Sequence, residues 1–139
     1  MQPQMSETEI EAFLDEVFPQ AQGYSVAGIS PDGASLRLAV TDRHLRPGGT
    51  VSGPTMFELA DVAMYAALLS RIGPVAMAVT TGASIDFMRK PAAGRDLLAD
   101  CRLLKLGRVL AVADVLIYSE GETQPVARAS LTYSIPPKA

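Results

Sequence analysis

The sequence predicts an α+β domain in which an antiparallel β-sheet wraps around one long helix. Three observations predict this fold class. One segment, at about residues 54–70, is apolar on nearly every face, which is typical of a helix enclosed by other structure. Two extended stretches precede that segment and four follow it. The turns between consecutive extended stretches are short, which favours antiparallel pairing.

Length and composition indicate a single globular domain over residues 1–139. A chain of this length buries roughly 68% of its unfolded surface, and 48% hydrophobic with 19% charged residues is an ordinary globular mixture. The 12 basic and 15 acidic side chains contain no basic block, which argues against a nucleic-acid partner. We expect no membrane partner and a cytoplasmic location, since neither a long apolar run nor a basic-then-apolar leader is present.

The scarce residue types exclude several kinds of site. Cys101 is the only cysteine and His44 the only histidine, so neither an internal disulfide nor a His/Cys metal cluster of usual spacing is expected. No nucleophile elbow and no phosphate-binding glycine motif occurs. We therefore expect no metal and no cofactor, and chemistry that rests on carboxylates, hydroxyls and backbone amides. Cys101 is expected in the core and His44 in an exposed loop.

The first 42 residues predict a helix followed by a β-hairpin. Ser6 and Glu9 form a capping box ahead of apolar residues at helical spacing, which predicts a helix over about 6–19. Two extended stretches, at about 23–30 and 34–42, flank a Ser-Pro-Asp-Gly turn. This N-terminal helix is additional to the long central one.

A proline near the start and a Gly-Pro pair after the end predict the bounds of the central helix. A Gly-rich linker leads to Pro54, which suits the first turn of a helix because an N–H there would have no partner. The helix runs to about residue 70, before Gly73-Pro74. Four strands are then expected, at about 75–89, 95–106, 109–119 and 124–136. A single sheet around one helix leaves an edge strand unpaired, so a homodimer is the expected assembly.

Two carboxylates interrupt the apolar helix. Glu58 and Asp61 lie three residues apart, with Tyr65 one turn further along the same stripe. Burying a carboxylate without partners is costly, so Asp61, deep in the apolar run, points to a general base or nucleophile. Glu58, near the helix start, fits better as a solvated or arginine-paired acid that suits the helix dipole.

The segment before the helix offers backbone donors. Gly53 and its neighbours present N–H groups without intrahelical partners at the positive end of the helix dipole. Glycine also lets a ligand approach the backbone closely, and such a site suits the oxyanion of an acyl-transfer reaction. A Ser52 N-cap and a tight turn without a ligand explain the same residues equally well.

Three strings resemble the hotdog-fold acyl-CoA thioesterases of the phenylacetate (PaaI-like) branch. They are GGTVSGPTMFELADVAMY at 48–65, AVTTGASIDFMRKPAAG at 78–94 and LLKLGRVLAVADV at 103–115. The resemblance covers about residues 24–136, and its most specific part is the eight-residue step from Gly53 to Asp61. It implies two protomers that pair their sheets edge to edge, with two sites at the dimer interface, often within a tetramer.

The resemblance also implies residue roles. Asp61 is expected to be the general base or nucleophile, and the Gly53 N–H is expected to polarise the thioester carbonyl. Thr80 is expected to position water and to face the other protomer's helix. Thr81 takes that place if the strand register is shifted by one residue, because such a shift reverses the face.

Two positions depart from the commonest pattern of this family. Ser52 stands where a histidine is usual, and Arg46 where an Asn or Gln is usual. The Arg46 cation is expected to bind Asp61 or Glu58, or a carboxylate on the acyl group. Substrate contacts are expected from Arg46, Ser52, Glu58, Tyr65, Thr81, Arg89 and Lys90, the last two lying where the family meets the phosphates of coenzyme A.

The expected activity is hydrolysis of an acyl-CoA or related thioester to a carboxylic acid and a free thiol. Coenzyme A is then part of the substrate and not a cofactor. One alternative is a non-catalytic acyl-CoA binding dimer, favoured by the substitutions at Ser52 and Arg46. The other is an enoyl-CoA hydratase-type hotdog enzyme, which pairs an aspartate with a histidine that this chain offers only as His44.

Overall fold

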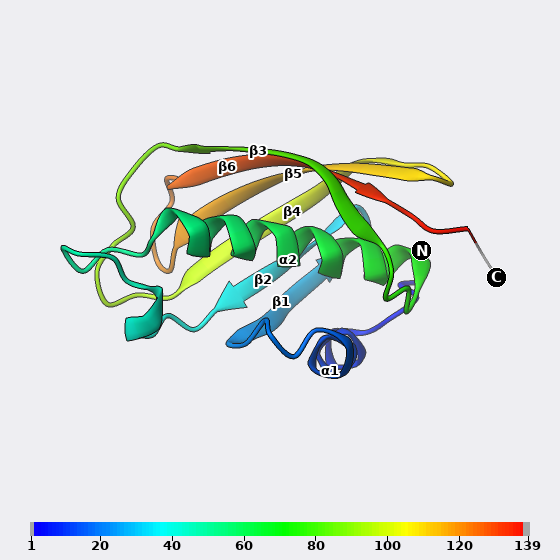
Figure 1. Ribbon diagram of the computed structural model, residues 1–139, viewed down its shortest axis with the longest axis horizontal. Helices are drawn as coiled ribbons and strands as arrows, with labels where there is room; N and C mark the ends of the chain where they lie inside the picture. Colours follow the sequence, from blue (N-terminus) through cyan, green and yellow to red (C-terminus); the bar gives the residue numbers. More distant parts are fainter. Residues whose placement is uncertain (1, 138–139) are drawn as a thin grey trace.

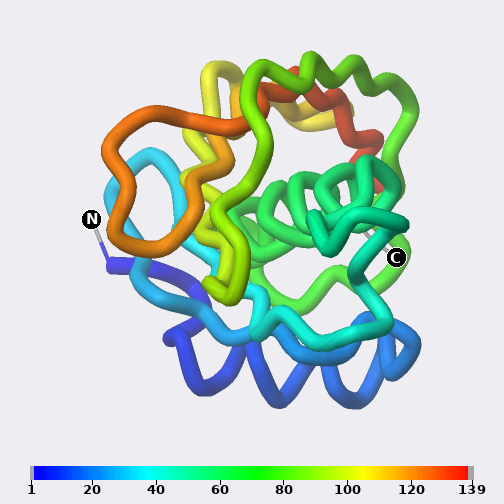
Figure 2. The backbone as a smooth tube through the Cα atoms, turned by 90° about the vertical axis from the view of Figure 1, so that its left-hand side faces the viewer, coloured from blue at the N-terminus to red at the C-terminus, as the bar shows by residue number. Residues whose placement is uncertain are grey.

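The computed structural model describes residues 2–137 and confirms the predicted α+β architecture (Figure 1). The strands are β1 (Tyr24–Ser30), β2 (Gly33–Leu38), β3 (Val79–Phe87), β4 (Leu97–Leu106), β5 (Leu110–Ser119) and β6 (Ala127–Ser134). They form one antiparallel sheet in the order β1-β2-β4-β5-β6-β3. Helix α2 (Gly53–Ile72) crosses the inner face of this sheet, and Figure 2 shows the chain curving around it.

Helix α2 is enclosed, as its lack of a polar face predicts. Every residue from Val62 to Ser70 is buried, so this stretch has no solvent face to cover with charge. The Ser52 side chain caps the helix by accepting a hydrogen bond from the Thr55 N–H at 3.3 Å. The chain leaves the helix at Gly73, whose φ of 87° lies in the left-handed region that favours glycine.

The two edges of the sheet differ in their protection. Helix α1 (Glu7–Val17) begins with the predicted Ser6 capping box and packs against β1. Its Glu11 accepts a hydrogen bond from the Val26 N–H at 2.7 Å, so α1 covers the β1 edge and occupies one of its backbone donors. The β3 edge has no such cover in the described chain, and Val79 and Phe87 are each 51% exposed.

Several predicted boundaries are wrong. The strand predicted from residue 75 begins at Val79, because residues 75–78 turn, with the Ala78 N–H donating to the Val75 carbonyl at 3.4 Å. The strand predicted to 42 ends at Leu38, because the chain turns into the 3-10 helix η1 (Asp42–His44). In the described residues, no helix is long and apolar enough to cross a membrane.

His44 is not the exposed loop residue that the sequence predicts. Only 6% of its surface is accessible, and its Nδ1 accepts a hydrogen bond from the Thr41 N–H at 2.9 Å. Burial, followed by the nearby Arg43 charge, lowers the pKa of His44. The ring is therefore a neutral part of the turn that leads toward α2.

Candidate active site

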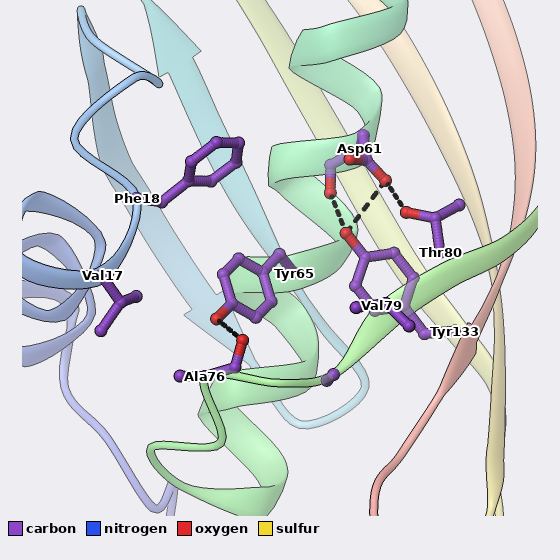
Figure 3. Close-up of a pocket in the computed structure, with 9 residues that line it drawn as sticks. Val17, Phe18, Asp61, Tyr65, Ala76, Val79, Thr80 and Tyr133 are labelled. Atoms are coloured by element: carbon purple, nitrogen blue, oxygen red, sulfur yellow. Dashed lines mark hydrogen bonds between the residues drawn. The ribbon is translucent and has the colours of Figure 1, made fainter.

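Asp61 lies at the centre of a cluster of hydroxyl groups (Figure 3). Its Oδ1 accepts hydrogen bonds from the Thr80 hydroxyl and from the Tyr133 hydroxyl, the latter at 2.9 Å. The Tyr133 hydroxyl is also 3.1 Å from the Asp61 backbone carbonyl. Asp61 is half-buried, between the fully buried Ala60 and Val62, so its carboxylate is both partnered and accessible.

The Thr80 hydroxyl bonds Asp61 of its own chain. The reason is its position on β3, where Thr80 pairs with Tyr133 and shares its inward face. A register irregularity follows between Thr80 and Gly82, and Thr81 falls within it. The Thr81 hydroxyl donates to the Thr132 carbonyl at 3.4 Å and does not line the space beside Asp61.

Tyr133 is a site residue that the sequence reasoning missed. It is 3% exposed, and its ring stacks on that of Tyr65 with centroids 6.1 Å apart. Burial and then the Asp61 charge raise the pKa of Tyr133, so the hydroxyl stays protonated and donates. Alternation along the predicted strand identifies Tyr133 as inward-facing, but only the fold brings its hydroxyl to Asp61.

Tyr65 lines the site with its ring, while its hydroxyl is bonded elsewhere. The hydroxyl donates to the Ala76 carbonyl at 2.9 Å, which holds the turn before β3 against α2. Burial raises the pKa of Tyr65 as well. The ring lies beside Asp61 in an open cleft of about 390 Å³, the Asp61 cleft, which is lined by Val17, Phe18, Asp61, Tyr65, Ala76, Ala78, Val79, Thr80 and Tyr133.

A second open space continues from the Asp61 cleft. This apolar groove, of about 640 Å³, shares Phe18 and Asp61 with the cleft and is lined by Phe18, Gly53, Pro54, Phe57, Glu58, Asp61, Ile85 and Phe87. Phe18 and Phe87 are lining residues that the sequence reasoning did not single out. Phe18 appears in the sequence only as an apolar position of the N-terminal helix, and its place over the site depends on how α1 packs.

Gly53 presents an unpartnered backbone donor to the apolar groove. At the start of α2, the Thr55 N–H bonds the Ser52 side chain, the Met56 N–H bonds the Ser52 carbonyl at 3.2 Å, and Pro54 has no N–H. The Gly53 N–H has no partner among the described residues. A Cβ added to Gly53 would lie 3.2 Å from the Phe87 ring, which would have to shift by a few tenths of an ångström to make room for it.

Three predicted substrate-binding cations lie in one place. A cleft of about 830 Å³, the basic cleft, is lined by Arg46, Pro47, Gly48, Thr50, Val51, Gly53, Pro54, Met56, Phe87, Met88, Arg89, Lys90 and Pro91. Its lining holds three cations and no carboxylate. The Arg89 guanidinium donates to the Pro125 carbonyl at 2.8 Å, which fixes that side chain.

Arg46 does not pair with Asp61 or Glu58 in the described chain, contrary to one expectation. Glu58 accepts instead from the Tyr24 hydroxyl, at 2.6 Å, so of its two expected surroundings, solvent or an arginine partner, the structure shows the first. Burial, followed by this bond, raises the pKa of Tyr24. Glu58 remains exposed at the margin of the apolar groove, so the groove carries a carboxylate at one end and the basic cleft at the other.

Comparisons with known proteins identify the family. The model of the Thioesterase superfamily matches residues 48–126. The chain belongs to the thioesterase superfamily. It is 37% identical over 102 residues to a Pseudomonas aeruginosa protein named "Putative esterase", a match that covers 73% of this chain and 74% of that one.

Solved structures of related proteins agree with this thioesterase-superfamily assignment. A crystal structure titled as a putative thioesterase from Silicibacter sp. TM1040 is 57% identical, with a TM-score of 0.91, over 99% of this chain and 96% of that one. A mutant of the phenylacetic acid degradation protein PaaI from Thermus thermophilus is 29% identical, with a TM-score of 0.72, over 86% and 98%. These likenesses confirm the predicted hotdog fold and the resemblance to the PaaI-like branch.

The donor and the carboxylate of this thioesterase-superfamily chain are separated along α2. Gly53 and Asp61 are eight residues apart, which corresponds to about 12 Å at the rise of an α-helix. Direct attack on a thioester carbonyl needs a shorter span, because the attacking atom lies about 3–3.5 Å from the carbon and the oxyanion donor about 3 Å from the oxygen. The rise between Gly53 and Asp61 of one chain therefore exceeds the reach of a direct attack. In the described residues, no cluster of three or more His, Cys, Asp or Glu side chains is arranged to hold a metal ion.

Proposed function

We propose that the protein hydrolyses an acyl-CoA or related thioester, with Asp61 as general base or nucleophile and the Gly53 N–H as oxyanion donor. One observation carries the proposal. Asp61 is the one half-buried residue in a helical stretch, 59–70, that is otherwise buried, and its carboxylate opens into a cleft that continues to an unpartnered backbone N–H. Membership of the thioesterase superfamily supports the same reaction class.

The proposed hydrolysis has two forms, which differ in the role of Asp61. As a general base, Asp61 takes a proton from water while the water oxygen attacks the thioester carbon, and collapse of the tetrahedral intermediate breaks the carbon–sulfur bond. As a nucleophile, Asp61 displaces the thiolate and forms a mixed anhydride that water then hydrolyses. In both forms the thiolate takes up a proton, and the products are a carboxylic acid and a free thiol.

The complete site needs two copies of the chain. Because Gly53 and Asp61 of one chain lie too far apart, the donor and the carboxylate of one site come from different protomers. The open edge strand β3 is the surface through which they meet. Its Val79 end lies beside Thr80 and Asp61, and its Phe87 end lies over Gly53.

Antiparallel pairing of two β3 strands about a two-fold axis places the Val79 end of one strand beside the Phe87 end of the other. The Gly53 of one copy is thereby brought toward the Asp61 of its partner. A homodimer with two equivalent sites results, and a tetramer of two such dimers is the larger assembly that the resemblance implies.

The surroundings of the site divide the substrate into two parts. The apolar groove is suited to an acyl group, since it is lined mainly by aromatic and aliphatic side chains. The basic cleft is suited to the phosphates of coenzyme A, because Arg46, Arg89 and Lys90 face it without a competing carboxylate. Arg46 thus takes a phosphate or an acyl carboxylate as partner.

Of the alternatives, a non-catalytic acyl-CoA binding dimer has a specific observation in its favour. Ser52 serves as the helix cap: its hydroxyl accepts from the Thr55 N–H at 3.3 Å and lies 2.8 Å from the Thr55 hydroxyl, an engagement that favours a structural role over that of a second oxyanion donor. The hydratase alternative loses support, because His44 is buried, bonds Thr41 through Nδ1 and lines none of the three clefts described above.

Hydrolysis of a panel of aliphatic and aromatic acyl-CoA esters by the parent protein and by Asp61→Asn tests the proposed function. We expect the parent to release free thiol and Asp61→Asn to lose at least about 100-fold in kcat, because the variant keeps the shape but loses the basic oxygen. Equal rates for the two proteins would remove Asp61 from the mechanism. Tight binding of the esters without any hydrolysis would favour the binding dimer.

A further inference from the structure

Within the proposed thioesterase site, on whose function this inference rests, we propose that Tyr133 is a positioning residue that fixes the Asp61 carboxylate with Oδ1 occupied and Oδ2 free to react. Both hydroxyl donors, Thr80 and Tyr133, bond Oδ1. In the described part of the chain, no hydrogen bond reaches Oδ2. The two oxygens of one carboxylate are therefore distinguished by the fold.

The Tyr133 hydroxyl contacts both the side chain and the backbone of Asp61. Its hydroxyl is 2.9 Å from Oδ1 and 3.1 Å from the backbone carbonyl of the same residue. A single O–H group placed between these two acceptors ties the side chain to the helix backbone. Rotation about the Asp61 side-chain bonds breaks that contact, so one rotamer is favoured.

The donor is itself held in place. Tyr133 is buried, it stacks on Tyr65, and it lies on β6 between β5 and β3. Groups fixed in this way by packing and pairing are suited to hold a reacting carboxylate in one geometry. Thr80 is held by fewer neighbours, because β3 is the open edge of the sheet.

Oδ1 and Oδ2 of Asp61 therefore have different roles in the proposed reaction. Two O–H donors stabilise negative charge on Oδ1, while Oδ2 keeps its lone pairs for the proton of water or for the thioester carbon. Tyr133 lines the Asp61 cleft and not the apolar groove assigned to the acyl group. It acts through Asp61, and its removal misplaces the reacting oxygen without changing the binding surfaces.

The variant Tyr133→Phe tests this role, since it keeps the ring and its packing and removes only the hydroxyl. Tyr24→Phe is the matched control, because it also removes a tyrosine–carboxylate hydrogen bond, that to Glu58. We expect Tyr133→Phe to lower kcat about 10- to 100-fold with KM changed less than about threefold. The kcat of Tyr24→Phe is expected to stay within about threefold of the parent.

A second readout does not depend on turnover. Carbon-13 NMR of the labelled aspartate carboxyls at a single pH near 7 reports the surroundings of Asp61, whose resonance is identified by its absence in Asp61→Asn. We expect this resonance to move in Tyr133→Phe and not in Tyr24→Phe, because Oδ1 of Asp61 loses one of its two O–H donors. An unmoved resonance would overturn the inference whether or not the parent hydrolyses thioesters. An inactive parent with a moved resonance would instead overturn the proposed function and leave the Asp61–Tyr133 contact intact.

Discussion

Asp61 interrupts an apolar helix, and its surroundings explain how the fold tolerates it. An isolated buried carboxylate costs several kcal/mol, but Asp61 is half-buried and accepts two O–H donors on one oxygen. Hydrogen bonds to a charged group contribute about 1.5–3 kcal/mol each. The cluster therefore offsets much of the desolvation cost while Oδ2 stays open to the cleft.

Cys101 shows the opposite case, a potentially reactive group that the fold makes inert. Burial, followed by the Asp114 charge, raises the pKa of Cys101 to about 12, so almost no thiolate is present at neutral pH. We expect a thiol reagent such as DTNB to leave the native protein unlabelled at pH 7 and to modify one thiol after unfolding in guanidinium. Rapid stoichiometric labelling of the native protein would contradict this assignment.

At the scale of single residues, the sequence could predict Asp61 but not its partners. A carboxylate inside an apolar helical run can be recognised from the sequence alone, because a buried carboxylate is unusual. Tyr133 is 72 positions away and reads as an ordinary inward-facing strand residue, and the burial of His44 depends on a turn formed with Thr41. Long-range side-chain contacts leave no local pattern to detect.

Among the elements, the loop before α2 determines where the Gly53 donor lies. The Ser52 N–H donates to the His44 carbonyl at 2.9 Å, and Leu45 forms an isolated bridge with Val51. The neutral His44 ring closes the turn at the start of this loop through its bond from Thr41. His44 thus supports the entry to the helix without contacting the three clefts.

The lowered pKa of His44 predicts a dependence of stability on pH. The unfolded state binds a proton below about pH 6.5, whereas the folded state binds it only at lower pH. The free energy of unfolding therefore falls as the pH drops from about 7 toward and through the folded value. We expect this fall in urea titrations of the parent relative to His44→Gln, which has no group that titrates there. The prediction would be contradicted if the free energy of unfolding changed with pH by the same amount in both proteins.

Element types were predictable, but several boundaries were not. Ser6 and Glu9 mark the start of α1 by local capping chemistry, and Gly73 ends α2 through its positive φ, so both ends are encoded nearby. The start of β3 depends instead on the Tyr65 hydroxyl, which holds the Ala76 carbonyl against α2. The irregularity after Thr80 likewise arises from pairing with β6 and sets which threonine faces Asp61.

The whole molecule has one protected edge and one open edge. Helix α1 covers β1, whereas β3 and the turn before it expose apolar side chains, including Met77 at 73% and Val79 at 51%. A long exposed apolar edge favours pairing with another strand. The sequence predicts that some edge must pair, but it does not identify β3, because the spatial order of the strands places β3 beyond β6.

A purified heterodimer shows whether Gly53 of one copy and Asp61 of another form one site. Gly53→Pro removes the N–H at a helix position that accepts proline. Gly53→Ala adds a similar contact with Phe87 and keeps the donor, so it is the matched control. Gly53→Pro and Asp61→Asn chains are co-expressed with different tags and purified through both.

We expect each variant homodimer to be nearly inactive and the heterodimer to recover about half of the parent's thioester hydrolysis per dimer, because one of its two sites keeps both groups. Pairing Gly53→Ala with Asp61→Asn should recover at least as much. A Gly53→Pro/Asp61→Asn heterodimer that is no more active than either homodimer would contradict the shared site.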